Sequence, residues 1–400
     1  MLTRSLSLAL YRSIDRSLAL ALHMDMGVVV SAIFLLSVYS SASDAAFTPP
    51  CPPGFVAFGD SLADTGNHLH LFPSHAVSGN PPYGSTFFNR PTGRYCDGRL
   101  LVDFIAASFN YPFLHPYLDS IGADFRHGID FAVSVSTANL TISTRLTLGV
   151  QVDEFILFKK EALLTKNLSS SDSQLPDQPS FFEDALYIVE IGGNDLRDAI
   201  VNLNVSIPEV ERTIVPQAVA AIAQNAKRLY AEGARNFLVL GILAQGCSAY
   251  TLTVFGTNNP SDLDSLGCLK TINNLVQIFN SQLQSAVREL RLQFLDAAIV
   301  FADYYSASLA IISNPSKYNF TPKLDACCGI GGKYNYDPRR PCGVAAVNLC
   351  SDPSIYINWD GRHFTDAFYR TIASLFLSGQ FLDPPINLIT VCSLLTPSDF

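Results

Sequence analysis

The sequence predicts an α/β fold in which a parallel sheet lies between two layers of helices. Four short apolar runs have the length and composition of buried strands, at residues 55–58, 186–191, 237–240 and 298–302. Longer segments with helical spacing of apolar residues lie at residues 99–109, 215–232, 269–295 and 364–377. Strands that alternate with helices in this way form parallel sheets covered on both faces.

Composition supports a large folded core and limits the classes of partner. Of the 400 residues, 48% are hydrophobic and only 15% are charged, and the formal net charge is −9. Nucleic acids and anionic membrane surfaces are bound through clustered Lys and Arg. The body of the chain has no basic run, so we expect neither of these partners.

The first 46 residues are predicted to be a leader that precedes a single domain at residues 47–400. An apolar run at residues 28–38 has the length of a signal peptide and is followed by small residues suited to cleavage. The run is too short for a membrane span, so we expect no stable span in the mature chain. Initiation at Met24 or Met26 would give a conventional signal peptide, and secretion is the expected outcome.

Cysteine usage agrees with secretion. The nine cysteines form no Cys-X-X-Cys pair, so they give little support to a metal site and indicate disulfides in an oxidising compartment. Their odd number leaves at least one thiol unpaired or intermolecular. Four Asn-X-Ser/Thr sequons are candidate glycosylation sites. They begin at Asn139, Asn167, Asn204 and Asn319.

Ser61 follows the first predicted strand directly, in residues 58–67 (FGDSLADTGN). Ligands of parallel α/β sheets bind beyond the carboxyl ends of the strands, which makes Ser61 a candidate nucleophile. A serine at such a place is also often a helix N-cap, and this alternative stays open for Ser61 taken alone. The Gly-X-Ser-X-Gly elbow of α/β-hydrolases is not met, because Ala63 occupies its last position.

Asp360 and His363 lie near the other end of the chain, in residues 358–365 (NWDGRHFT). A nucleophilic serine needs a base, and the base needs a group that fixes its tautomer and stabilises the imidazolium. A compact Asp-X-X-His turn supplies both. The alternative is that Asp360 caps a helix that begins near Phe364, with His363 exposed in its first turn.

Asn194 follows another predicted strand, in residues 192–195 (GGND). Its carboxamide can donate a hydrogen bond to an oxyanion, and the loss of one such donor typically costs about 3 kcal/mol of transition-state stabilisation. Gly-Gly-Asn would also suit an asparagine in a left-handed turn.

Taken in this order and with these local sequences, the motifs around Ser61, Asn194, Asp360 and His363 resemble those of the plant GDSL esterase/lipase family of the SGNH hydrolase superfamily. Further matches are GRYCDGRL at residues 93–100, ACCG at 326–329 and IYINWDG at 355–361. The resemblance covers about residues 53–385. It implies a flavodoxin-like, three-layer α/β/α SGNH hydrolase fold. It also implies a carboxylic ester hydrolase of the cell wall or apoplast, or alternatively of the vacuole or another secretory compartment. The expected substrate is a lipid, acetylated or other small ester.

The mechanism that this resemblance implies begins when Ser61 attacks an ester carbonyl while His363, held by Asp360, removes its proton. The oxyanion is held by the N–H groups of Ser61 and Val135 and by the Asn194 side chain. His363 then protonates the leaving alcohol, and water repeats the sequence on the acyl-enzyme. No metal or organic cofactor is required.

Val135 departs from the family pattern, which reads roughly Asn-Phe-Ala-X-X-Gly-Ala where this chain has DFAVSVS at residues 130–136. Valine keeps its N–H but brings a β-branched side chain to a place where the backbone approaches substrate, and a positive φ there would be strained. We therefore expect a narrower or slower enzyme. Asp130 in place of Asn is a second local change.

Two other functions use the same residues. An acyltransferase would form the same acyl-enzyme and transfer it to an alcohol, and the sequence does not separate this from hydrolysis. A catalytically weakened binding protein is the second alternative, motivated by Val135. A metal site at His68, His70 and His75 is disfavoured, because no Cys or carboxylate completes the set at ligand spacing.

Overall fold

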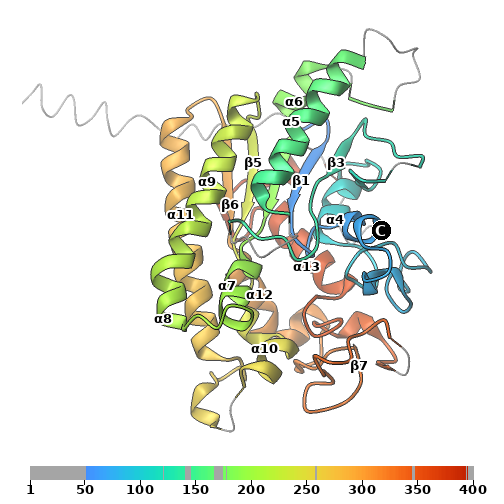
Figure 1. Cartoon of the computed structure of the whole chain (residues 1–400), viewed down its shortest axis with the longest axis vertical. Coiled ribbons are helices and arrows are strands. Elements are labelled where there is room, and N and C mark those ends of the chain that lie inside the picture. Colours follow the sequence, from blue (N-terminus) through green and yellow to red (C-terminus); the bar gives the residue numbers. More distant parts are fainter. Residues whose placement is uncertain are drawn as a thin grey trace, which may run out of the picture. The chain divides into compact units, whose positions relative to one another are not determined.

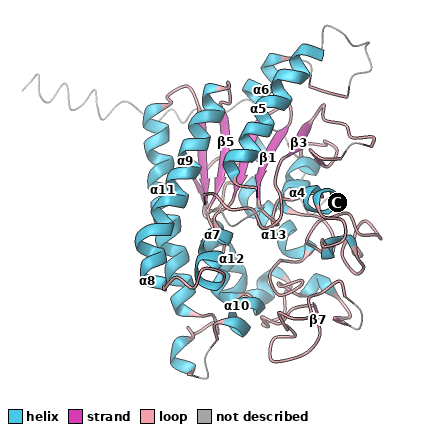
Figure 2. Cartoon of the chain, viewed as in Figure 1, coloured by secondary structure: helices cyan, strands magenta, loops and turns pink. Residues whose placement is uncertain are grey.

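The central sheet has seven strands in the order β2-β3-β1-β4-β5-β6-β9 and lies among helices (Figures 1 and 2). The strands are β1 (Phe55–Gly59), β2 (His115–Pro116), β3 (Gly128–Asp130), β4 (Leu186–Glu190), β5 (Asn236–Leu240), β6 (Ala298–Ala302) and β9 (Leu382–Asp383). All neighbours pair in parallel except β6 and β9. The five inner strands β3-β1-β4-β5-β6 repeat the 2-1-3-4-5 order of flavodoxin-like sheets, so the predicted fold class is confirmed.

This computed structural model describes residues 51–119, 121–139, 146–165, 174–176, 178–256, 259–344, 347–392 and 394. The predicted leader, with Met24 and Met26, and the sequon at Asn167 lie outside the described residues. Residues Thr48–Phe400 form one compact unit. Within the described part, no helix combines the length and the apolarity that a membrane span requires.

Side chains of the inner strands are buried on both faces of the sheet, which explains why the strands are continuous apolar runs. In β1, Phe55 and Ala57 face one hydrophobic core, and Val56 and Phe58 face the other. The helices that contribute to the first core are α4 (Leu101–Ser108), α12 (Tyr304–Ser313) and α13 (Asp366–Leu377). Those of the second are α5 (Leu148–Thr165), α6 (Pro179–Asp184), α7 (Gly193–Val201), α9 (Val215–Ala231) and α11 (Lys270–Gln293).

The predicted strands correspond to β1, β4, β5 and β6, and the predicted helices to α4, α9, α11 and α13. The prediction did not assign β2, β3 or β9, which have only two or three residues each, nor the helices α5, α7 and α12. The remaining short elements are α3 (Asn67–Leu71), α8 (Ile207–Glu209), α10 (Ala249–Val254) and α14 (Leu388–Cys392), with the pair β7 (Cys328–Gly329) and β8 (Asn348–Leu349).

Disulfides close the fold at several places. The pairs are Cys51–Cys392, Cys247–Cys268, Cys327–Cys350 and Cys328–Cys342. Two of them hold the loops around β7 and β8. Cys96 is the thiol left unpaired, as the odd count predicted, and it is buried.

Candidate active site

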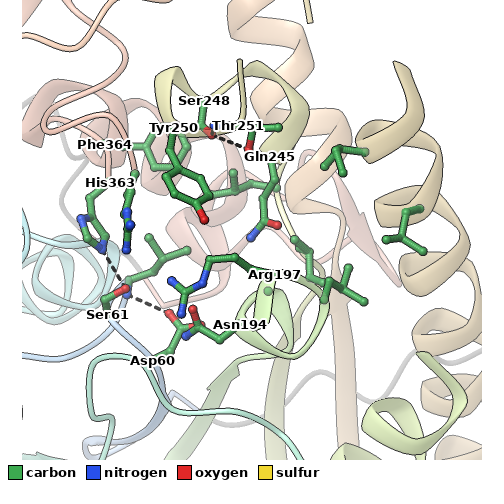
Figure 3. A pocket seen from close by; sticks show the side chains of 18 of the residues that line it. Asp60, Ser61, Asn194, Arg197, Gln245, Ser248, Tyr250, Thr251, His363 and Phe364 are labelled. Carbon is green, nitrogen blue, oxygen red and sulfur yellow. Dashed lines mark hydrogen bonds between the residues drawn. The ribbon is translucent and has the colours of Figure 1, made fainter. Parts of the chain in front are cut away.

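The three residues predicted for catalysis lie together beyond the carboxyl end of β1, and Figure 3 shows two of them, Ser61 and His363. His363 Nε2 lies 2.8 Å from Ser61 Oγ, and His363 Nδ1 lies 2.6 Å from Asp360 Oδ2. All three are buried, with 7–9% of their surface exposed. Ser61 and His363 are 302 residues apart in the chain. The contact therefore depends on the tertiary fold and not on local sequence.

The alternative structural roles for these residues are wrong. Ser61 lies in a turn and caps no helix, since the next helix, α3, begins at Asn67 after Gly66. The helix after the Asp-X-X-His turn is α13, and its N-cap is Thr365, whose side chain accepts a hydrogen bond from the Phe368 N–H. Neither member of the turn is needed as a cap.

Asp360 is held by four donors. Its Oδ1 accepts from the N–H groups of Arg362 (2.9 Å) and His363 (2.8 Å), and its Oδ2 accepts from the Tyr83 hydroxyl at 2.7 Å as well as contacting the His363 ring. Burial alone would raise the pKa of Asp360, but the charge and hydrogen bond of His363 and the hydrogen bond from Tyr83 hold it well below its usual range. Asp360 is therefore an anion that fixes the imidazole.

Gly361 shapes the turn between Asp360 and His363. Its φ is +90°, and a Cβ at this position would lie 2.3 Å from the Tyr336 ring. A residue with a side chain is therefore excluded here by both backbone conformation and space. The turn brings the carboxylate back to the imidazole.

Asn194 is the second residue of α7. The left-handed residue at the start of this helix is Gly192 (φ +118°), so the left-handed turn considered for Asn194 is wrong. The Asn194 Nδ2 donates to Asp60 Oδ2 at 3.1 Å and to the Ser136 carbonyl at 2.8 Å. Both amide hydrogens are thus in use, so one of these bonds must be shared or released for Asn194 to bind an oxyanion.

Val135 has a φ of +66°, the positive value that a glycine would tolerate and a β-branched residue adopts only with strain. No described residue accepts a hydrogen bond from the N–H of Val135 or of Ser61. Asp64 Oδ2 accepts from the adjacent Ser134 N–H at 2.7 Å, which ties this segment to the loop of the nucleophile. Both N–H groups therefore lack an acceptor among the described residues, and Val135 is not among the residues that line the pocket.

Asp130, the second departure from the family pattern, is fully buried. Its Oδ2 accepts from the N–H and hydroxyl of Thr65 at 2.7 and 2.8 Å, and its Oδ1 accepts from the Ala132 N–H. Burial and the neighbouring Asp64 raise its pKa well above the usual value. Asp130 therefore positions the loop after Ser61 and takes no place in the pocket.

A pair of buried carboxyl groups forms the floor beside the nucleophile. Asp60 follows β1, and Glu190 ends β4 opposite Gly59 in the sheet register. Burial raises the pKa of Asp60 to about 6, and burial together with the neighbouring Asp60 raises that of Glu190 well above its usual value. The pair therefore retains a proton in mildly acidic solution.

Two buried arginines from residues 93–100 bind the segments that carry the catalytic residues. Arg94 makes a bidentate contact with Asp103 (2.7 and 2.8 Å) and donates to the Thr65 carbonyl. Arg99 binds Asp366, at the start of α13, through its N–H and its guanidinium group. The segment thus connects the loop of Ser61 to the helix that follows His363.

The pocket at Ser61 is lined by both polar and apolar side chains. Its polar residues include Asp60, Asn194, Arg197, Gln245, Tyr250 and Arg362, and its apolar residues include Leu196, Ile242, Phe255, Ile272 and Phe364. Figure 3 shows Gln245 across the pocket from His363, with Tyr250 between them. Such a lining suits an ester that has both an apolar body and polar groups.

Sequence reasoning missed several residues of the site. Glu190 ends an otherwise apolar strand, and that pattern was a usable signal. Tyr83 and Gln151 gave none. Gln151, on α5, accepts from the Gly59 N–H and donates to the Gly59 carbonyl at 2.9 and 2.8 Å, so it fixes the end of β1 from a distant helix.

The remaining predicted sites lie outside the pocket. Asn139, Asn204 and Asn319 are exposed, as glycosylation requires. His68 Nδ1 contacts the Tyr95 hydroxyl at 2.9 Å.

The chain matches the GDSL-like Lipase/Acylhydrolase family over residues 55–376. An esterase of Hevea brasiliensis is 39% identical over 357 residues, which cover 85% of this chain and 89% of the relative. A GDSL esterase/lipase of Arabidopsis thaliana is 39% identical over 375 residues, or 90% and 89% of the two chains. Acetylajmalan esterase 2 of Rauvolfia serpentina is 37% identical over 368 residues, or 90% and 97%.

Proposed function

The chain belongs to the GDSL-like lipase/acylhydrolase family of carboxylic ester hydrolases, and from this premise we propose that Ser61, His363 and Asp360 carry out its reaction. The observation that carries the proposal is the continuous contact from Ser61 Oγ through the imidazole to the Asp360 carboxylate, at 2.8 and 2.6 Å. These distances are within hydrogen-bonding range, so proton transfer needs no rearrangement.

In the proposed reaction, His363 carries the proton between Ser61 and the leaving alcohol. Asp360 accepts a hydrogen bond from His363 Nδ1–H and so keeps that proton on Nδ1, which leaves Nε2 unprotonated and able to take the Ser61 proton as Oγ attacks the ester carbonyl. The oxyanion forms beside the N–H groups of Ser61 and Val135, with Asn194 as the third donor. His363 gives its proton to the leaving alcohol, and water then repeats the attack on the acyl-enzyme.

The substrate is proposed to be a lipid, acetylated or other small ester. The pocket supports this through its mixture of apolar and polar walls. The name of the Rauvolfia relative indicates hydrolysis of an acetyl ester of a small organic molecule, which agrees with this range.

Secretion is also part of the proposal, with residues 1–46 as a leader and residues 47–400 as one hydrolase domain in the cell wall, the apoplast or another secretory compartment. Four disulfides among the described residues support an oxidising compartment, because disulfides are rare in the cytosol. Exposed sequons at Asn139, Asn204 and Asn319 are compatible with glycosylation.

Expression of the full-length chain in a secretory host, with hydrolysis of 4-nitrophenyl acetate and butyrate as the assay, tests the proposed roles. We expect Ser61→Ala to lower kcat by a factor of at least about 10³, since removal of a nucleophile leaves only oxyanion binding. Ser85→Ala, at an exposed serine, is the matched control. Equal, background rates for wild type and Ser61→Ala would contradict the catalytic role for these esters. Sequencing the N-terminus of the secreted protein tests the leader.

A further inference from the structure

Arg362 lies between Asp360 and His363 in the Asp-X-X-His turn, and its side chain is held by two aromatic residues. Its guanidinium carbon lies 4.3 Å from the centroid of the Tyr250 ring, and its Nε donates to the Tyr336 hydroxyl at 3.1 Å. Tyr250 belongs to α10 and Tyr336 to the loop between β7 and β8, so two separate segments hold the guanidinium group in place.

Arg362 forms no direct ion pair in the part of the chain that the structure describes, although the Asp360 carboxylate acts on it at longer range. No described Asp or Glu lies within 4 Å of its guanidinium group, and its two terminal nitrogens have no described acceptor. Arg197, the other arginine of the pocket, instead contacts Asp198 at 2.8 Å. Arg362 therefore offers a full positive charge at the exposed edge of the pocket that contains Ser61 and His363.

We propose that Arg362 binds a carboxylate or another anionic group of the ester substrate, an inference that rests on the proposed function because the group must belong to a molecule that reaches Ser61. A guanidinium group presents a planar pair of N–H donors that matches a carboxylate in a bidentate manner. Because Tyr250 and Tyr336 already fix the group, little side-chain freedom is lost when the anion binds.

The floor of the pocket is compatible with an anion. Asp60 and Glu190 are the acidic residues that line the pocket, and burial raises the pKa of Asp60 to about 6 and that of Glu190 well above its usual value. The anionic Asp360 is not among the lining residues, and its carboxylate is already bonded to four donors. They hold protons in mildly acidic solution and then repel an anion little. Arg197 and His363, the other charged or titratable groups that face Asp60, carry positive charge or none.

A purely structural role for Arg362 predicts a different outcome from substrate recognition. If the side chain only joins the turn to Tyr250 and Tyr336, its replacement weakens binding of neutral and anionic esters equally. If it binds an anion, the replacement changes the ratio of the two affinities. The ratio is therefore the quantity to measure.

The experiment uses full-length Ser61→Ala protein, which binds esters without turning them over, and isothermal titration calorimetry. The first ligand pair is mono-4-nitrophenyl glutarate and its methyl ester, which differ by one charge on the acyl side. The second pair is 3-acetoxybenzoate and its methyl ester, which differ by one charge on the alcohol side. We expect about tenfold or tighter binding of the anionic member in one pair, as for a hydrogen-bonded charge.

In the same background, Arg362→Gln should remove that preference, and Arg362→Lys, which keeps the charge but not the planar donors, should retain part of it. Arg212→Gln, at an arginine that is 73% exposed and ion-paired with Glu209, is the matched control and should keep the preference. Near-ultraviolet circular dichroism checks that the variants are folded.

An equal affinity for both members of both pairs, or a preference that survives Arg362→Gln, would overturn the inference. The pair that shows the preference identifies whether the acyl or the alcohol side carries the anion. Because binding is measured without turnover, this result is separate from the Ser61→Ala rate test. A protein that hydrolyses neutral esters but shows no Arg362-dependent preference refutes the inference and leaves the proposed function intact.

Discussion

Replacement of Tyr83 by Phe measures how much the hydrogen bond from Tyr83 to Asp360 contributes to stability and to catalysis. The Tyr83 hydroxyl is fully buried and donates to Asp360 Oδ2 at 2.7 Å, while its ring packs edge-on against Trp359 with centroids 5.9 Å apart. Phe keeps the ring contact and removes only the hydrogen bond. Since a hydrogen bond to a charged group contributes roughly 1.5–3 kcal/mol, we expect the free energy of unfolding to fall by about 2 kcal/mol.

The size of this loss depends on pH with a defined sign. The pKa of Asp360 is depressed in the folded protein, so the stability it contributes is complete above its unfolded pKa of about 4 and is lost as the pH falls through the folded pKa. Removal of the Tyr83 donor raises that folded pKa. The difference between wild type and variant is therefore full above about pH 4 and narrows in stronger acid.

The effect on catalysis should be smaller than the effect of losing Asp360 itself. The backbone N–H groups of Arg362 and His363 still hold Oδ1, so the carboxylate keeps its orientation in Tyr83→Phe. We expect kcat for 4-nitrophenyl acetate to fall by about tenfold or less, equivalent to about 1.4 kcal/mol in the activation barrier.

Urea unfolding at pH 7 and at pH 3, followed by circular dichroism, provides the assay for stability. Tyr369→Phe is the matched control, because Tyr369 is also fully buried but its hydroxyl has no hydrogen-bond partner among the described residues. Its removal should change the free energy of unfolding by less than about 0.5 kcal/mol. Equal losses in the two variants at pH 7 would refute the assignment of the Tyr83 effect to Asp360.

Three further substitutions test other parts of the site. In Val135→Gly, the +66° φ no longer carries a β-branched side chain; roughly 1–2 kcal/mol of relieved strain offsets the added chain entropy of glycine. We expect near-unchanged stability and severalfold faster hydrolysis of 4-nitrophenyl acetate, because a glycine adopts this φ without strain and its N–H can orient freely toward the oxyanion. An equal or lower rate would contradict the expectation that Val135 slows the enzyme. Gly361→Ala places a Cβ 2.3 Å from Tyr336 at a φ of +90°, so melting should show a loss of at least about 1–2 kcal/mol along with a fall in kcat; wild-type values would show that the turn tolerates a side chain. Glu190→Gln tests the raised pKa of Glu190, whose contribution to stability is full below its unfolded pKa of about 4.3 and is lost as the pH rises. Urea unfolding from pH 4 to 8 should therefore show a shallower decline of the free energy of unfolding in the variant than in the wild type. Parallel declines in the two proteins would count against the raised pKa.

The main elements of the fold and the three proposed catalytic residues are readable from sequence because each has a local signature. The inner strands β1, β4, β5 and β6 are apolar on both faces, and the ends of β1 and β4 place Ser61 and Asn194 at one edge of a parallel sheet. Asp360 and His363 are only three residues apart, so a single turn determines their contact. Such features can be recognised from the order of residues in the chain alone.

Residues that act across the fold could not be predicted in this way. Tyr83 reaches Asp360 over a separation of 277 residues, and Gln151 reaches Gly59 over 92 residues. Neither has a distinctive neighbour in sequence, because its role comes from tertiary packing. Short strands such as β3 were missed for a related reason: three residues carry too little periodicity to mark a strand, and pairing with β1 creates it.

The Cys51–Cys392 disulfide has a consequence for the topology of the covalent chain. The Cα atoms of the two cysteines are 5.5 Å apart although 341 residues separate them, so everything between them forms a closed loop. A single proteolytic cut in an exposed loop opens this circle without releasing a fragment, and the two pieces part only after reduction. The same proximity makes the domain suited to circular permutation: a short peptide joining the neighbourhoods of Cys51 and Cys392 would allow new chain ends to be placed in a surface loop far from Ser61.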